Sequence, residues 1–256
     1  MKTENIPKTI WRVIYPYAVY LMISVTVSSV MMQYSYDNTV TQILVSACIT
    51  IPIMYLFFYA DKKDTRSIMN TQYEKLHIYK YIYVAILGVE LCLSVNGIID
   101  LLCIKNLFKS YQDISAQIYG SSIHMIILTT VVAAAVLEEL LYRGLIYNRI
   151  KNTCGVLISA IISSLIFGAA HWNPIQFIYG FIAGMVMCYV YEKYRNLWAP
   201  IILHMSANLT SVLVQEYVGD VMLSQERIIM LIIECLLVAC ILWVISRYVN
   251  RIIKHN

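Results

Sequence analysis

Three short groups of polar side chains interrupt apolar segments of this chain, and each group contains a residue type that can move a proton or hold a charge. The first has two adjacent carboxylates and a guanidinium, the second a histidine, and the third a histidine and an amide: Glu138, Glu139 and Arg143; His171; His204 and Asn208. A charge near the centre of a bilayer is costly, so an ionisable residue there is a functional candidate by default. Together the groups supply a base, a proton shuttle and hydrogen-bond donors, the roles that attack of water on a carbonyl carbon requires.

The adjacent glutamates should play different parts. Consecutive helical residues point about 100° apart, so we expect that the two carboxylates cannot face the same partner. Arg143 follows Glu139 by four residues, which is the favourable order for an ion pair along a helix. Glu139 is therefore expected to pair with Arg143, leaving Glu138 unneutralised and the better general base. The alternative is a helix end at which both carboxylates lie among lipid headgroups.

The two histidine groups each have a structural interpretation as well. Phe167 lies one helical turn before His171 and could pack against its imidazole, and a histidine beside a tryptophan is often interfacial. His204 and Asn208 share one helix face and could join two helices by hydrogen bonds. Burying all three polar groups in a membrane costs free energy that helix packing alone does not require. Their combination therefore favours a catalytic function.

The elements that must position these groups are membrane helices. Of 256 residues, 60% are hydrophobic and 13% are charged, whereas soluble domains are about half apolar and a quarter charged. This composition excludes a soluble domain or a disordered chain, and 7 cysteines in a chain of this length do not form a secreted disulfide scaffold. We predict an all-α polytopic bundle of about eight transmembrane helices, at 11–32, 40–60, 79–104, 121–141, 155–171, 175–192, 198–217 and 228–249.

Basic residues give the predicted orientation. With the N-terminus inside, 16 of the 19 Lys and Arg residues fall on the inner side, and the outer side holds Lys105, Lys109 and Arg227. The positive-inside rule then places both termini in the cytosol. Because the basic residues are spread between apolar runs rather than gathered in one patch, no nucleic acid partner is expected.

We divide the chain into three parts. Residues 1–120 hold the first three helices and a cytosolic loop at 61–78, residues 121–215 form the catalytic core, and residues 216–256 form the last helix and a tail. The largest outer loop is 105–120. Other ionisable residues within apolar runs receive no catalytic role: Glu90, Asp100, His124 and Glu234.

The polar groups also carry a family resemblance. The stretches EELLYR at 138–143, FGAAH at 167–171 and HMSAN at 204–208 follow, in order, the patterns EExxxR, FxxxH and HxxxN. In this the chain resembles the CPBP (Abi) intramembrane proteases, which include the type II CAAX prenyl endopeptidases. The resemblance covers about 121–215 and implies a peptidase whose cavity opens to the cytosol.

The resemblance also implies a role for each motif residue. Glu138 would activate water together with His171, while His204 and Asn208 would hold the developing oxyanion. Glu139 and Arg143 would be structural. One tension remains: the predicted topology places Glu138 and His204 near the inner face but His171 at the outer end of its helix, although groups that act on one water must lie within a few ångström.

We expect no cofactor. Zinc held by Glu138, His171 and His204 is the alternative, since members of the family are often named metalloproteases. The spacing is not that of an H-E-x-x-H site, however, and asparagine serves better as a hydrogen-bond donor than as a zinc ligand. A zinc enzyme would also need a separate glutamate as base, and Glu139 is already assigned to Arg143.

The expected function is hydrolysis of a peptide or lipid-modified peptide at the membrane. A composition rich in Ile, Lys, Tyr and Asn is typical of an AT-rich bacterial gene, so we expect a multi-pass protein of a bacterial plasma membrane. Bacteria normally lack prenylated partners, which favours peptide maturation or bacteriocin self-immunity over CAAX processing. The alternatives are a non-catalytic membrane scaffold, and a proton-coupled transporter that uses Glu90, Glu138 or Glu234.

Overall fold

The computed structural model describes residues 6–36, 38–68, 76–102 and 117–217, together with four isolated positions, Ile229, Ile232, Ile233 and Leu236. The predicted eighth helix at 228–249, most of the outer loop at 105–120, both chain ends and Glu234 therefore lie outside the described residues. The side chain of Asp100 does as well.

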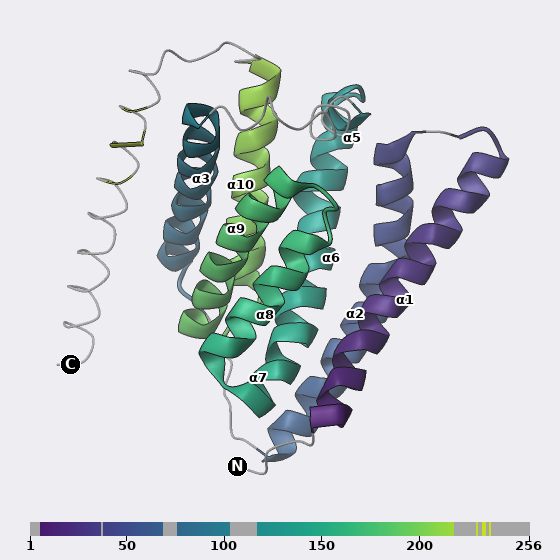
Figure 1. Ribbon diagram of the computed structural model, residues 1–256, viewed down its shortest axis with the longest axis vertical. Coiled ribbons are helices and arrows are strands. Elements are labelled where there is room, and N and C mark those ends of the chain that lie inside the picture. The colour runs from purple at the N-terminus through teal and green to yellow at the C-terminus, as the bar shows by residue number, and fades with distance from the viewer. Residues whose placement is uncertain are drawn as a thin grey trace.

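The described residues form an all-α bundle (Figure 1). Three separate helices come first: α1 (Ile6–Gln33), α2 (Thr39–Ile68) and α3 (Ile78–Leu101). One long helix follows from Ile123 to Cys154 and has five consecutive segments, of which the two η segments are π-helical: α5 (Ile123–Ile126), η2 (Ile127–Ala134), α6 (Ala135–Glu139), η3 (Leu140–Tyr147) and α7 (Asn148–Cys154). The last three are α8 (Val156–Ala169), α9 (Pro174–Tyr194) and α10 (Trp198–Tyr217).

Five of these helices are long and apolar enough to cross a membrane, which makes the chain a multi-pass membrane protein. They are Ile6–Gln33, Thr39–Lys63, Ile78–Ile99, Ile123–Cys154 and Pro174–Tyr194. The predicted fifth span is wrong as a span, because α8 has 14 residues. That is about 21 Å of helix, whereas the hydrocarbon core of a bilayer is about 30 Å thick.

The long helix corrects a second expectation. Its predicted end was residue 141, but it continues to Cys154 and stops only at Gly155, where φ is 78°. The polar residues after 141 do not end the helix because they find partners inside the protein. Asn148 donates to the carbonyl oxygen of Gly144 at 3.0 Å, and the guanidinium of Arg149 binds Asp61 at 2.6 Å.

The short α8 forms a hairpin with α9, held together by small residues. A Cβ atom added at Gly180 would lie 3.1 Å from the Cα atom of Gly168, and one added at Gly184 would lie 2.8 Å from Ser164. Such close approach of helix backbones is typical of membrane helix pairs with small residues four apart. The side chain of Asn173 caps α9 by accepting from the backbone N–H of Ile175 at 2.9 Å.

Two ends of the bundle can be distinguished in Figure 1. We call the inner end the one where α1, α3, α8 and α10 begin and where α7 and α9 finish. The opposite end, where α5 begins and α10 finishes, is the outer end. Described Lys and Arg residues away from the motif Arg143 occur towards the inner end: Lys8, Arg12, Lys62, Lys63, Arg66, Lys80, Arg149, Lys151, Lys193 and Arg195.

Candidate active site

The length of the helices brings the three motif groups to one depth. Glu138 precedes Cys154 by 16 residues, and His171 follows Gly155 by 16 residues, so both lie about 24 Å or less from the same inner turn. The expectation that Glu138 lies near the inner face is therefore wrong, and His171, although it lies at the outward end of its helix, does not reach the outer face because α8 is short. Glu138 lies at the middle of a 32-residue helix, and the short α8 carries His171 up to meet it.

Glu139 and Arg143 form the predicted ion pair. Arg143 Nη1 donates to Glu139 Oε1 at 2.7 Å, and both side chains are fully buried. The guanidinium of Arg143 also lies over the ring of Phe167, 4.6 Å from the ring centroid. A buried charge needs such partners, because an uncompensated charge in this environment is strongly destabilising.

His204 lies between the two glutamates. Its Nδ1 is 2.9 Å from Glu139 Oε1, and its Nε2 is 3.7 Å from Glu138 Oε2. The expectation that adjacent glutamates share no partner is thus wrong, because each approaches a different nitrogen of one imidazole ring. Glu139 consequently holds both Arg143 and His204 through the same oxygen atom.

His171 has its ring fixed by its own helix. Its Nδ1 lies 2.9 Å from the carbonyl oxygen of Phe167, and the two rings meet edge-on with centroids 5.2 Å apart, which confirms the predicted packing. A carbonyl oxygen can only accept a hydrogen bond, so Nδ1 carries a proton, and in the neutral ring Nε2 then has a lone pair. Phe167 also meets the ring of His204, at 5.9 Å between centroids, and so lies between the two histidines.

Asn208 joins α10 to the long helix. Its Nδ2 donates to the carbonyl oxygen of Thr130 at 2.8 Å, which occupies one of its two amide hydrogens. Thr130 belongs to the π-helical segment η2, and a second such segment, η3, follows Glu139. Segments of π-helix are rare and frequently occur at functional sites, but no sequence signal identified Thr130 in advance.

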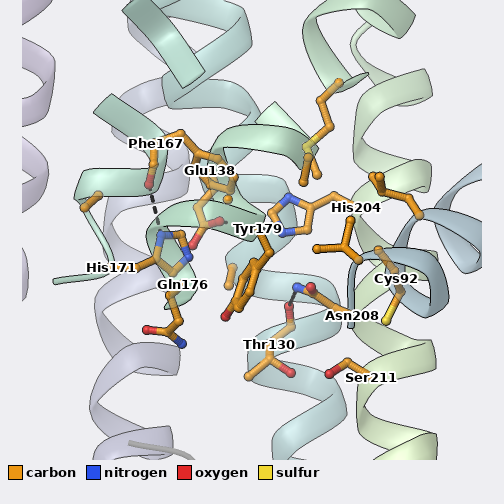
Figure 2. A pocket seen from close by; sticks show the side chains of 18 of the residues that line it. Cys92, Thr130, Glu138, Phe167, His171, Gln176, Tyr179, His204, Asn208 and Ser211 are labelled. Atoms are coloured by element: carbon orange, nitrogen blue, oxygen red, sulfur yellow. Dashed lines mark hydrogen bonds and ion pairs between the residues drawn. The ribbon is translucent and has the colours of Figure 1, made fainter. Parts of the chain in front are cut away.

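A cavity of about 370 Å³ brings these groups to a common space (Figure 2). Glu138, His171, His204 and Asn208 all line it, and the carboxyl side chain of Glu138 is 24% exposed. Further polar lining residues come from α3, α9, α10 and residue 119, and sequence analysis missed them because they carry no motif: Cys92, Asn96, Tyr119, Gln176, Tyr179 and Ser211.

The described residues show no assembled set of metal ligands. No three His, Cys, Asp or Glu side chains within the described ranges converge as ligands of one ion would. Glu138 and His204 approach each other, but the free nitrogen of His171 completes no ligand set with them. Two other ionisable residues of the apolar runs, His124 and Glu90, do not line the cavity. His124 is exposed, whereas Glu90 is buried and its carboxylate oxygens have no hydrogen-bond partner among the described residues.

Comparison with known proteins points to the same residues. Residues 120–210 match the sequence model of the family described as type II CAAX prenyl endopeptidase Rce1-like. A protein of Bacillus subtilis (strain 168) named "Putative membrane peptidase YdiL" is 25% identical to this chain over 94 residues. That match spans 37% of this chain and 38% of the relative's length. No solved structure matches the chain.

The matched segment contains every motif residue described above, from Glu138 to Asn208. The resemblance that the three motifs indicated is thereby confirmed over this part of the chain. Residues 120–210 are similar to the type II CAAX prenyl endopeptidase Rce1-like family, and the relative that they resemble is named a membrane peptidase.

Proposed function

We propose that this chain is an intramembrane endopeptidase that hydrolyses a peptide bond at the middle of the membrane, with water activated by Glu138 and His171. One observation carries the proposal: a partly exposed carboxylate and two imidazole rings, each held by a second group, face one cavity at a single depth. A general base must lie within hydrogen-bond reach of its proton donor, and a cavity shared by these groups allows a water molecule that reach.

In the proposed reaction, Glu138 takes a proton from water as the water oxygen attacks the carbonyl carbon of the substrate. The C–O bond forms and the carbonyl electron pair moves to the oxygen. When the C–N bond breaks, the proton passes to the leaving nitrogen, either from Glu138 or through His171. The lone pair on Nε2 of His171 suits that transfer, because its Nδ1 is already committed to Phe167.

His204 and Asn208 are proposed to bind the oxyanion. Asn208 has one amide hydrogen left after its bond to Thr130. His204 donates through Nδ1 to Glu139, so donation from Nε2 as well requires the imidazolium form. Donors of this kind lower the barrier most when they point to where charge develops.

No step is routed through a metal ion, since the described residues offer no converging set of ligands. The test is to purify the protein in detergent, measure its metal content and assay it after dialysis against a strong chelator. Activity that survives chelation supports the proposed chemistry. Stoichiometric zinc, with activity lost on chelation and restored by zinc, would overturn it and make Glu139 the better candidate for the base.

The central experiment compares membrane peptides from cells with wild-type protein and with Glu138→Gln. Glutamine keeps the shape of the side chain and removes the base, so we expect cleavage to fall by several orders of magnitude at an unchanged protein level. The matched control is Glu90→Gln, which removes a buried membrane carboxyl that does not line the cavity. Equal peptide sets for wild-type and Glu138→Gln would favour a non-catalytic scaffold instead.

The substrate proposed is a peptide or a lipid-modified peptide, reached from the membrane. Maturation of a secreted peptide, or self-immunity to a bacteriocin, would use such cleavage. The peptides that accumulate in the Glu138→Gln variant would identify the substrate directly.

A further inference from the structure

We propose that the active-site cavity is entered from the extracytoplasmic side, and that its substrate is an uncharged internal stretch of a peptide presented from that side. The nature of the substrate rests on the proposed peptidase function, whereas the direction of entry does not. The resemblance to CAAX-type proteases implied the opposite, a cavity open to the cytosol.

The cavity occupies the middle and the outer half of the bundle. Most of the lining residues lie at mid-depth or nearer the outer end of their helices, whereas Met187 of α9 and His204 of α10 lie nearer the inner ends. The lining reaches outward as far as residues 118 and 119, which precede the long helix, and no described residue in 143–166 or 188–203 takes part. The contributing residues are Tyr20 of α1 and Ile43 of α2, with further ones from 91–96 of α3, 130–142 of the long helix, 167–171 at the end of α8, 176–187 of α9 and 204–212 of α10.

The inner half is closed by packed side chains. All eight residues of η3, directly below the catalytic glutamates, are buried. Tyr147 and Tyr191 pack edge-on with ring centroids 5.9 Å apart, and Asn148 donates to the hydroxyl of Tyr191 at 2.7 Å. Lys151 binds Glu192 at 2.6 Å at the same level. Among the described residues, this layer lies between the cavity and the inner end.

Charge identifies the inner end as cytosolic. The described stretches of the outer half contain no Lys or Arg, whereas the inner end carries basic residues on five of the helices. Cytoplasmic segments of membrane proteins carry an excess of Lys and Arg. The packed layer therefore faces the cytosol, and the cavity faces away from it. The outer stretches without a basic residue are 28–42, 95–102, 117–130, 170–180 and 208–217, with position 37 not described.

The chemistry of the lining indicates the kind of substrate. Apart from Glu138 and the two histidines, the outer wall is made of apolar residues and uncharged polar ones such as Asn96, Gln176 and Ser211. No Lys or Arg lines the cavity, so it lacks the side chains that usually bind the carboxylate of a free C-terminus. Amide and hydroxyl groups can instead pair with the backbone of an extended peptide. A volume of about 370 Å³ accommodates only a short stretch of chain.

Two native cysteines allow a direct test of the entry side. Cys92 lines the cavity, and Cys154 is exposed at the inner turn between α7 and α8. The other cysteines are replaced by alanine, giving one chain with only Cys92 and a matched chain with only Cys154: Cys48, Cys103, Cys188, Cys235 and Cys240 are removed from both. The probe is a small, permanently charged methanethiosulfonate that does not cross membranes.

We expect Cys92 to react in intact cells and Cys154 to react only in inside-out vesicles, with rates that differ by at least an order of magnitude between the two preparations. Labelling after denaturation verifies that both thiols are intact. If the replacements impair folding, the same comparison is made on the wild-type chain by mapping the modified cysteine with mass spectrometry. Reaction of Cys92 only in inside-out vesicles, or in neither preparation, would overturn the proposed direction of entry.

The two proposals fail in different ways. If Cys92 reacts from outside but peptide profiles do not depend on Glu138, the direction of entry stands and the peptidase function fails. If cleavage depends on Glu138 but Cys92 reacts only from inside, the function stands and the direction fails. An exported peptide cleaved by intact cells, with its cleavage blocked by prior modification of Cys92, would support both.

Discussion

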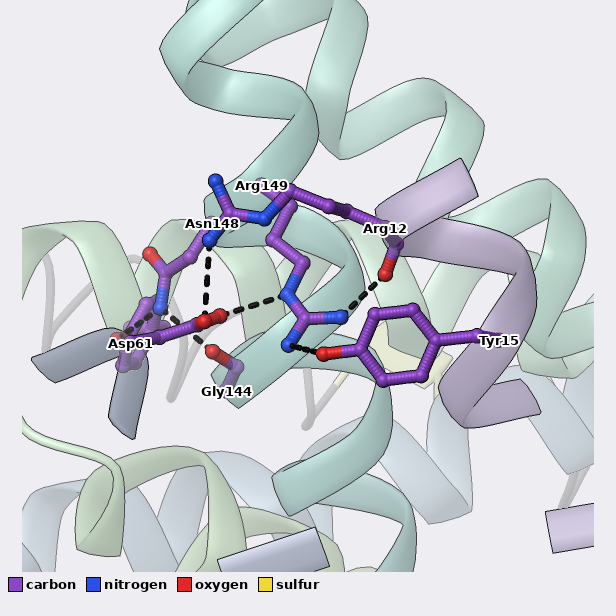
Figure 3. A network of polar contacts seen from close by, with 7 residues as sticks. Arg12, Tyr15, Asp61, Gly144, Asn148 and Arg149 are labelled. Atoms are coloured by element: carbon purple, nitrogen blue, oxygen red, sulfur yellow. Dashed lines mark hydrogen bonds and ion pairs between the residues drawn. The ribbon is translucent and has the colours of Figure 1, made fainter. Parts of the chain in front are cut away.

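Polar side chains at the inner end of the bundle are bound to one another, whereas those at the level of the cavity line open space. At the inner end, Arg149 donates to Asp61 at 2.6 Å, to the hydroxyl of Tyr15 at 2.7 Å and to the carbonyl oxygen of Arg12, which joins α7 to α1 and α2 (Figure 3). Its guanidinium also lies 4.8 Å from the centroid of the Tyr15 ring. At the level of the cavity, by contrast, Glu138 and His171 line open space, and Glu138 Oε2 lies 3.7 Å from Nε2 of His204, which is longer than a hydrogen bond.

One helix therefore carries both a residue that binds neighbouring helices and a residue proposed to act in catalysis. The long helix supplies Arg149 to the inner network and Glu138 to the cavity, three helical turns apart. Paired charges contribute rigidity but have no capacity left for a substrate, whereas a partly exposed carboxylate in a cavity keeps that capacity. Glu139 marks the boundary, because it is fully buried and paired but also holds the imidazole that faces the cavity. Substitutions in the three zones should therefore have three distinct effects.

The largest effect is expected at this boundary, for Glu139→Gln. Oε1 of Glu139 accepts from both Arg143 and His204, and glutamine can keep that oxygen while losing the charge. Arg143 would then be a buried, uncompensated cation, which costs about 3–5 kcal/mol of stability. We expect a low protein level and a lowered midpoint of thermal unfolding in detergent, together with reduced cleavage.

The control for this prediction is the double variant Glu139→Gln/Arg143→Met, which removes the unpaired cation. Replacement of a buried ion pair by apolar residues is often neutral for stability, so the double variant should recover much of the protein level. Its activity should stay low, because His204 has lost its charged partner. A single Glu139→Gln protein that folds normally and is inactive would instead exchange the roles of Glu138 and Glu139.

The next effect concerns the cavity alone. His204→Ala and Asn208→Ala should each lower kcat by about 10²–10³-fold while KM changes little, because their bonds strengthen only as negative charge develops on the substrate oxygen. Steady-state assays on a cleaved reporter peptide measure the two constants separately. The matched control on the same helix is Ser206→Ala, since Ser206 does not line the cavity. A raised KM with an unchanged kcat would assign His204 and Asn208 to substrate recognition.

Short-range features of this fold were predictable from the sequence. The Glu139–Arg143 pair and the contact of Phe167 with His171 follow from helical spacing of four residues, and the structure contains both. The all-α fold follows from composition in the same way. Such contacts can be predicted once a single helix is assigned correctly, because both residues lie on that helix.

Long-range features were not predictable. The stretch after residue 141 resembles a helix end because it contains Arg149 and other polar residues, and only the fold shows that Asp61, 88 residues away in sequence, compensates that charge. Placing the helix end too early displaced Glu138 towards the cytosol and produced the conflict with His171. Likewise, nothing in the sequence of α3 indicates that Asn96 lines a cavity with α9 and α10.

The smallest effect is expected at the inner end, for Asp61→Asn. The Asp61 carboxylate binds both Arg12, at 3.0 Å, and Arg149, at 2.6 Å, but it is 21% exposed, so solvent screens part of the interaction. Arg149 would keep its bonds to Tyr15 and to the backbone of Arg12. We therefore expect a loss of about 1 kcal/mol, seen as a small drop in the thermal midpoint, with cleavage per folded molecule unchanged. A drop in kcat at full stability would show that the inner network is coupled to the cavity, and the separation of the two halves would then not hold.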